Sequence, residues 1–115
     1  MTKEAYVSYE IAKLLKEKGF CERCFMCYEQ DGKVFEGFGN WNKVDIYIAA
    51  PTHQVACAWL REKGYHIYVD YNTKYNCWHR HIQETSTGII WSLGGLKSHD
   101  DAIENAIKYS LEVLI

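Results

Sequence analysis

The sequence has little proline, no long apolar run and no excess of positive charge, and each shortage excludes a class of protein. One proline and a composition that is 48 % hydrophobic are typical of a folded chain and exclude a disordered one. No apolar run approaches the ~18 to 20 residues that a membrane-spanning helix needs. The start MTKEAYVSYE lacks the basic and apolar regions of a secretory signal. We therefore expect a cytoplasmic protein without a membrane segment.

Positive charge is not in excess, since the formal net charge is −2. Nucleic-acid binding depends on Lys and Arg side chains that neutralise phosphates. One expected hairpin mixes basic and base-stacking side chains, but the patch is small and has acidic neighbours; it contains Lys74, Tyr75, Trp78 and Arg80. The sequence therefore disfavours nucleic acid and favours a protein partner or self-association.

Five cysteines, an odd number, cannot all form disulfides within one chain. Without a secretory signal we expect reduced thiols. Three of them stand in CERCFMC, residues 21–27, at a spacing that metal sites use. A strand expected from Cys24 onward would point Cys24 and Cys27 to opposite faces, so the two thiols could not hold one ion. A role as small buried apolar residues is favoured, and zinc or redox chemistry is the alternative.

Three segments show the apolar spacing of amphipathic helices, and each follows a capping residue. Ser8 precedes a helix over residues 9–18, Thr52 precedes a second helix, and Ser98 precedes a third with the clearest period. A glycine follows the last turn of the first two, which is a typical helix stop.

Between these helices the apolar period changes to two, which indicates strands. The runs are CFMCYEQDGKVFEGF, with a turn at Asp31-Gly32, then VDIYIAA, YHIYVDY, CWHRHIQE and GIIWSL. SLGGL, at residues 92–96, is expected to be a turn. We predict a single α+β domain over residues 1–115, with an antiparallel sheet of about five to six strands and three helices packed mainly on one face.

The segments EAYVSYEIAKLLKEKGF, APTHQVACAWLREK and DAIENAIKYSLEVLI resemble those of a group of small proteins from gut anaerobic bacteria and their phages. The resemblance runs across the chain and is carried by the three helical segments. No activity is assigned to that group. The resemblance therefore implies a phage or mobile-element origin and an intracellular accessory role, and it supplies no site residues.

Two of the expected strands, YHIYVDY and CWHRHIQE, place several histidines on one face of the sheet. If their apolar residues share the buried face, the other face carries His66, Tyr68, Asp70, Cys77, His79, His81 and Gln83. A pairing that keeps these faces together would set His66 across from His81 and Tyr68 across from His79.

We expect this face to bind a protein partner through His66, Tyr68, His79 and His81, without a cofactor and without a catalytic role. The alternative is a zinc-binding protein or metal-dependent hydrolase in which His66, His79 and His81 hold the ion and leave one position for water. A further thiol and imidazole, Cys57 and His53, stand four residues apart in the second helix. A boundary position without chemistry is favoured for that pair.

Overall fold

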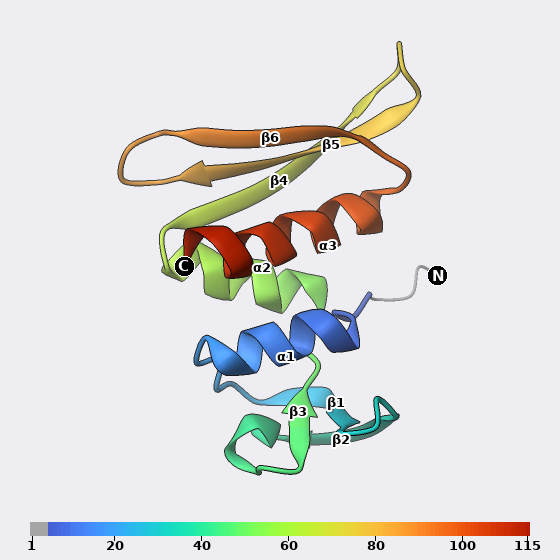
Figure 1. Cartoon of the computed structure of the whole chain (residues 1–115), viewed down its shortest axis with the longest axis vertical. Helices are drawn as coiled ribbons and strands as arrows, with labels where there is room; N and C mark the ends of the chain where they lie inside the picture. The colour runs from blue at the N-terminus through green and yellow to red at the C-terminus, as the bar shows by residue number, and fades with distance from the viewer. Residues whose placement is uncertain (1–4) are drawn as a thin grey trace. The chain divides into compact units, whose positions relative to one another are not determined.

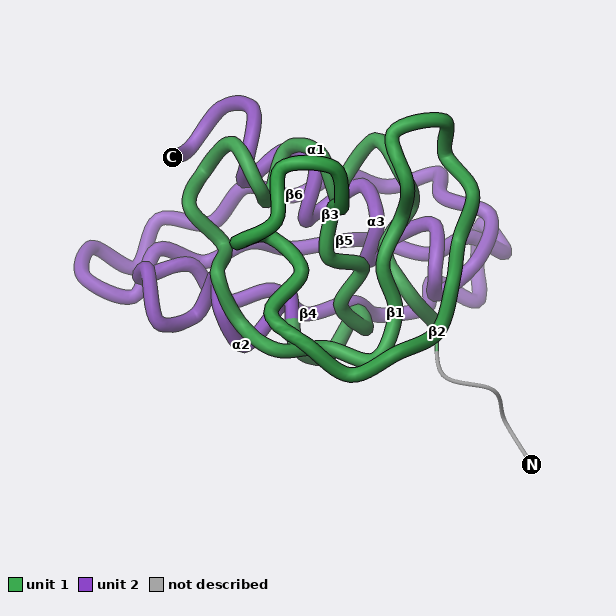
Figure 2. The backbone as a smooth tube through the Cα atoms, turned by 90° about the horizontal axis from the view of Figure 1, so that it is seen from below, with its two compact units in different colours: residues 1–55 green, residues 56–115 purple. Residues whose placement is uncertain are grey.

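Three α-helices and six strands make up residues 5–115, the part of the chain that the computed structural model describes (Figure 1). They divide into two units, residues 1–55 and residues 56–115 (Figure 2). The predicted α+β class is confirmed. The strands form two three-stranded antiparallel sheets in place of the single sheet that the sequence predicted. No helix in the described part is long and apolar enough to cross a membrane.

The first unit contains one helix and one sheet. Its elements are α1 (Tyr9–Glu17), β1 (Cys24–Glu29), β2 (Val34–Gly39), the 3₁₀ turn η1 (Trp41–Lys43) and β3 (Tyr47–Ala49). Strand β1 is central, between β2 and β3. Tyr28 of β1 donates its hydroxyl to the carbonyl of Val7 at 2.8 Å, and its ring makes an edge contact with Tyr9 at the start of α1. These contacts hold the first turn of α1 to the sheet.

The second unit contains a sheet with one helix packed on it. Its elements are β4 (Tyr65–Asn72), β5 (Cys77–Glu84), β6 (Ile90–Leu96), α3 (His99–Tyr109) and the π-helical turn η2 (Ser110–Leu114), while α2 (His53–Glu62) crosses the boundary between the units. Strand β5 is central, and α3 covers one face of the sheet (Figure 1). Ile82 of β5 and Ile107 of α3 are fully buried. Apolar burial between helix and sheet therefore defines which face is inside.

The three predicted helix starts are confirmed. Ser8, Thr52 and Ser98 each accept a hydrogen bond from the backbone N–H three residues further on, at 3.3, 3.2 and 3.0 Å. Gly19 and Gly64 follow the first two helices with φ of +95° and +101°. This left-handed backbone ends both helices as predicted.

The segment SLGGL, residues 92–96, lies inside β6 and is not the turn that the sequence predicted. Between two regular pairs of β5 and β6, Gly94 and Gly95 together lie opposite a single residue of β5, His79. Two residues opposite one define a β-bulge. Gly95 has φ +78°, which glycine adopts without the clash of a Cβ. The strand therefore continues through the two glycines.

The cysteines of CERCFMC occupy different environments. Cys21 is exposed, whereas Cys24 and Cys27 are buried in β1. Cys24 and Cys27 stand three residues apart in the strand, and the prediction that they point to opposite faces stays a prediction. Burial raises the pKa of the Cys27 thiol to about 11. Their role as small buried apolar residues fits this arrangement, since a protonated thiol is a poor metal ligand and nucleophile.

Candidate functional site

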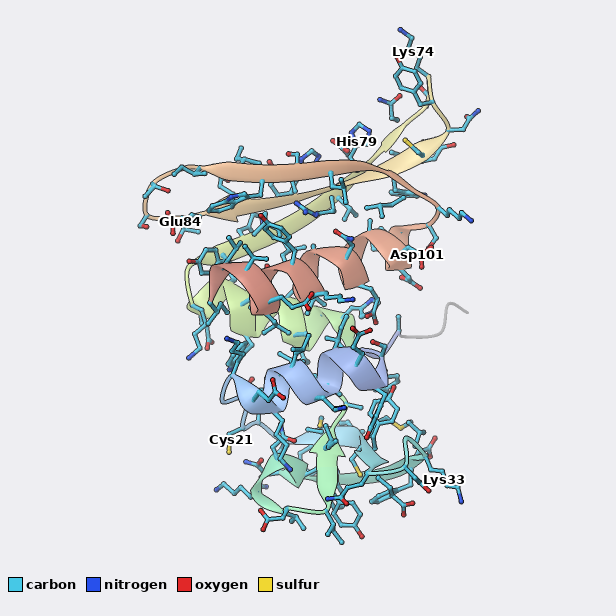
Figure 3. The ribbon with its side chains drawn as sticks, viewed as in Figure 1. Cys21, Lys33, Lys74, His79, Glu84 and Asp101 are labelled. Carbon is cyan, nitrogen blue, oxygen red and sulfur yellow. The ribbon has the colours of Figure 1, made fainter. Side chains whose placement is uncertain are left out.

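The outer face of the second sheet is the face that the sequence singled out. Ile67 and Ile82 lie opposite each other and are buried on the α3 side. Side chains alternate along β4 and β5, so their histidines point away from α3. Figure 3 shows His79 on this outer side. The predicted choice of face is therefore correct.

The pairing of β4 with β5 differs from the predicted one by two residues. Tyr68 lies across from His81, and Asp70 lies across from His79. The predicted pairs, His66 with His81 and Tyr68 with His79, are wrong. A shift of two residues keeps every side chain on its face but gives it a new neighbour. The shift brings Asp70, rather than His66, to the two histidines.

The turn between β4 and β5 sets this pairing. The Oδ1 atom of Asn72 accepts hydrogen bonds from the backbone N–H groups of Lys74 and Tyr75, at 3.0 and 3.2 Å. Asn76 closes the turn with φ +51°, a left-handed conformation that asparagine tolerates. Residues 73–76 therefore form the loop, and the strand pairs follow from its position.

Asp70, His79 and His81 form a cluster in which each offers one ligand atom within 4.8 Å of the others. Asp70 Oδ1 lies 3.2 Å from Nε2 of His81 and 3.9 Å from Nδ1 of His79. The side chain of His81 is 16 % exposed, that of His79 is 32 % exposed and that of Asp70 is 62 % exposed. The cluster thus has a buried end at His81 and a solvent-facing end at Asp70.

The two ring nitrogens of His81 have different surroundings. Nδ1 lies 2.7 Å from the hydroxyl oxygen of Ser92, which is across from His81 on β6. Nε2 is buried and makes no hydrogen bond, although Asp70 Oδ1 is near it. A proton on Nδ1 would be donated to the Ser92 oxygen, whereas a proton on Nε2 would face the Asp70 carboxylate and leave Nδ1 to accept from the Ser92 hydroxyl. In the first of these tautomers the lone pair of Nε2 faces the carboxylate of Asp70, as it would in a metal ligand.

His79 lies against the bulge of β6. A Cβ atom placed on Gly94 would lie 2.7 Å from Nε2 and 2.8 Å from Cδ2 of the His79 ring, closer than such atoms can approach. The ring therefore occupies space that only a glycine leaves free. Its other nitrogen, Nδ1, is the one directed at Asp70.

Tyr68 and His66 extend the same face along β4. The Tyr68 ring stacks on His81 at a centroid distance of 4.8 Å and on His66 at 5.6 Å. His66 belongs to this row of rings and not to the cluster of ligand atoms around Asp70. Of the four predicted binding residues, the structure thus brings His79 and His81 together with Asp70, and it places Tyr68 and His66 beside them.

Arg80 does not join the basic hairpin patch that the sequence outlined. Its side chain is buried on the α3 side, where it donates to the Asn105 side chain and to the Trp91 carbonyl, both at 2.8 Å. The guanidinium also lies over the Tyr109 ring at 4.7 Å, and burial lowers its pKa. A phosphate or base could not reach this cation, which weakens the nucleic-acid interpretation further.

The thiol of Cys57 is a poor candidate nucleophile. Burial raises its pKa to about 11, which keeps it protonated at neutral pH. A catalytic thiol needs the opposite shift, because the thiolate is the reactive form. The pair of Cys57 and His53 therefore gains no support as a site.

Two residues of the site come from β6 and were missed by the sequence analysis. Ser92 and Gly94 belong to the segment whose second half was expected to be a turn. Alternation through the whole of β6 would have placed both on the histidine face. Asp70 was placed on this face from the sequence but was not considered as a ligand, because the pairing of β4 with β5 was shifted.

Comparisons with protein families, with curated proteins and with solved structures find no match for this chain. Function is therefore inferred from the chemistry of the site.

Proposed function

We propose that the protein binds a divalent transition-metal ion through Asp70, His79 and His81. The convergence of three ligand atoms within 4.8 Å on one sheet face is the observation that carries the proposal. Two imidazoles and one carboxylate form a nitrogen and oxygen donor set that suits Zn²⁺, Fe²⁺, Co²⁺ and Ni²⁺. The sequence had suggested a histidine-bound zinc as an alternative, and Asp70 now takes the place of His66 in that proposal.

The distances in the cluster fit a metal centre. Two ligands about 2.0 to 2.1 Å from a tetrahedral zinc stand about 3.3 Å apart. Asp70 Oδ1 and His81 Nε2 are 3.2 Å apart, so an ion can contact both atoms without a change in the backbone. The 3.9 Å between Asp70 Oδ1 and His79 Nδ1 closes with a small rotation of two side chains that are partly exposed.

The surroundings of the His81 ring support the same proposal. With the proton of its ring donated from Nδ1 to Ser92, the lone pair of Nε2 and the carboxylate of Asp70 face each other at 3.2 Å. Two acceptors repel at this distance, so a cation between them would stabilise this tautomer. An outer partner such as Ser92 is also the device that orients histidine ligands in metal sites.

The test is metal binding by the tag-free protein and by two matched variants. We expect about one Zn²⁺ per chain by elemental mass spectrometry, and a Kd at least about 100-fold weaker for Asp70→Asn, since even outer partners contribute 10- to 100-fold. His66→Gln removes a histidine from the same face and should leave the Kd unchanged. The proposal would be overturned if the unmodified protein bound no Zn²⁺. It would also be overturned if His66→Gln lost Zn²⁺ binding while Asp70→Asn kept it.

A second candidate is the protein-binding surface that the sequence predicted. The row of rings formed by His66, Tyr68 and His81 supports it, because half-exposed aromatic side chains supply contact area at low entropic cost. We propose an intracellular partner or self-association at this face. Tyr68→Ala should then abolish partner capture or self-association while the unfolding temperature stays near that of the unmodified protein. Retained association in this variant would contradict the second candidate.

A further inference from the structure

We infer that the metal ion at this site keeps coordination positions open toward solvent and takes a small bidentate oxygen donor with one negative charge, such as a hydroxamate or a hydroxycarboxylate. The inference rests on the proposed metal binding. It goes further because a structural metal would have a complete protein shell and no exchangeable ligand.

Three histidine, cysteine or acidic side chains of the described residues supply ligand atoms to the cluster. Within residues 5–115, no fourth side chain of these types joins the cluster of Asp70, His79 and His81. Zinc requires at least four donors, and the other candidate ions commonly take six. The hydroxyl of Ser92 is engaged with Nδ1 of His81 and is not directed at the ion. With three ligands from the described residues, at least one position is left for a donor from outside the cluster.

The open positions lie on the accessible side. All three ligands project from the same face of one sheet, with Asp70 on β4 and the histidines on β5, so the sheet backs the ion from one side only. The exposed fraction rises from 16 % at His81 to 62 % at Asp70. A ligand can thus approach from the Asp70 end. The neighbouring β6 offers Gly94 at this point, which has no side chain to cover the site.

The charge and donor type of the site select the ligand class. A divalent ion with one carboxylate and two neutral imidazoles retains about one positive charge. That charge complements a monoanion. The shell has no thiolate, whose strong donation would lower the affinity of the ion for oxygen ligands. A hydroxamate or hydroxycarboxylate supplies two oxygens in a five-membered chelate and can expand a four-coordinate zinc to five.

The experiment uses full-length, tag-free protein loaded with Co²⁺, whose visible absorption reports the number and type of its ligands. Acetohydroxamate is the probe. We expect a saturable change in the Co²⁺ spectrum with a 1:1 end point, while equilibrium dialysis shows that the cobalt stays with the protein. His66→Gln should give the same titration, since His66 stands outside the ligand cluster.

The possible outcomes distinguish a failure of the open coordination positions from a failure of the proposed metal site. Failure to take up Co²⁺ would overturn the proposed metal site itself. Uptake of Co²⁺ with a spectrum that does not respond to acetohydroxamate would leave the metal site intact and overturn the open positions. Removal of the cobalt by the probe, without a protein-bound ternary complex, would also overturn them.

Discussion

At the scale of single residues, the site depends on a glycine, Gly94, as much as on the side chains that lie around the two histidines. The His79 ring can lie against β6 only because Gly94 has no Cβ, and the His81 ring is oriented by the Ser92 hydroxyl, whose oxygen lies 2.7 Å from Nδ1. Neither Gly94 nor Ser92 would itself hold the ion. Both set the direction of a histidine lone pair, which is the property that a metal ion requires of its ligand.

Gly94→Ala should weaken metal binding about 10-fold or more without unfolding the protein. The new methyl group would displace the His79 ring, because it would stand 2.7 Å from Nε2. The backbone of Gly94 is not in the left-handed region, so alanine adds no strain there. The measurement is the Zn²⁺ Kd by competition with a chromogenic chelator, with the unfolding temperature recorded for the metal-free protein.

Gly88→Ala is the matched control for that variant. Gly88 has φ +78° and no atom within 4 Å of its missing Cβ, so alanine there costs stability through backbone strain alone. We expect a lower unfolding temperature and an unchanged Kd. An unchanged Kd in Gly94→Ala, or equal weakening in both variants, would contradict the role assigned to Gly94.

At the scale of elements, the alternation of side chains along β5 puts the two histidines on one face of the sheet and a buried arginine on the other. His79 and His81 face the outer side, while Arg80 between them is buried against α3. The guanidinium is bound by the Asn105 side chain, the Trp91 carbonyl and the Tyr109 ring. One side chain thereby connects β5 to β6 and to α3. The strand that carries the histidine ligands is held from behind by a polar network rather than by apolar packing alone.

Arg80→Ala should lower the free energy of unfolding by about 2 to 4 kcal/mol. It removes two hydrogen bonds from partly buried acceptors, Asn105 Oδ1 and the Trp91 carbonyl, and leaving such a polar group unsatisfied costs about 1 to 3 kcal/mol. Urea unfolding followed by tryptophan fluorescence measures the change. Arg61→Ala, at an exposed position of α2, should stay within about 0.5 kcal/mol of the unmodified protein. A loss below about 1 kcal/mol for Arg80→Ala would show that the network contributes little.

At the scale of the whole molecule, the two units carry different chemistry. The proposed metal site lies entirely in the second unit, residues 56–115, and no group of three metal-ligating side chains is found among the described residues of the first. Each unit has its own sheet. The prediction of a single domain over residues 1–115 stays a prediction, and it concerns whether the two units unfold together.

Hydrogen exchange with and without Zn²⁺ tests whether the two units unfold together. A ligand at 100 times its Kd stabilises the state that binds it by about 2.7 kcal/mol, which slows exchange through unfolding about 100-fold. We expect that slowing for the amides of β4, β5 and β6 and no comparable change for those of β1, β2 and β3. Equal slowing in both sheets would contradict this expectation and would support one cooperative domain. Asp70→Asn protein is the control and should show no slowing in either sheet.

The sequence determined the local structure and the face on which the site lies. The helix starts could be predicted from their capping residues, Ser8, Thr52 and Ser98, because a side-chain cap bonds to a backbone N–H only two or three residues further along the chain. The period-two runs identified β4 and β5 and put His79 and His81 on the polar face, because alternation is a property of a strand by itself. These features need no information about distant parts of the chain.

Only the tertiary structure decided which residues meet across strands. The predicted and observed pairings of β4 with β5 place the same residues on the same face, so burial alone could not choose between them. The turn around Asn72 and Asn76 made the choice and brought Asp70 to His79 and His81. The bulge at Gly94 and the approach of Ser92 followed from the pairing of β6. Hydrophobic periodicity specifies the inside and the outside of a strand, whereas a ligand set requires a register, and a register is fixed by turns and bulges that act between strands.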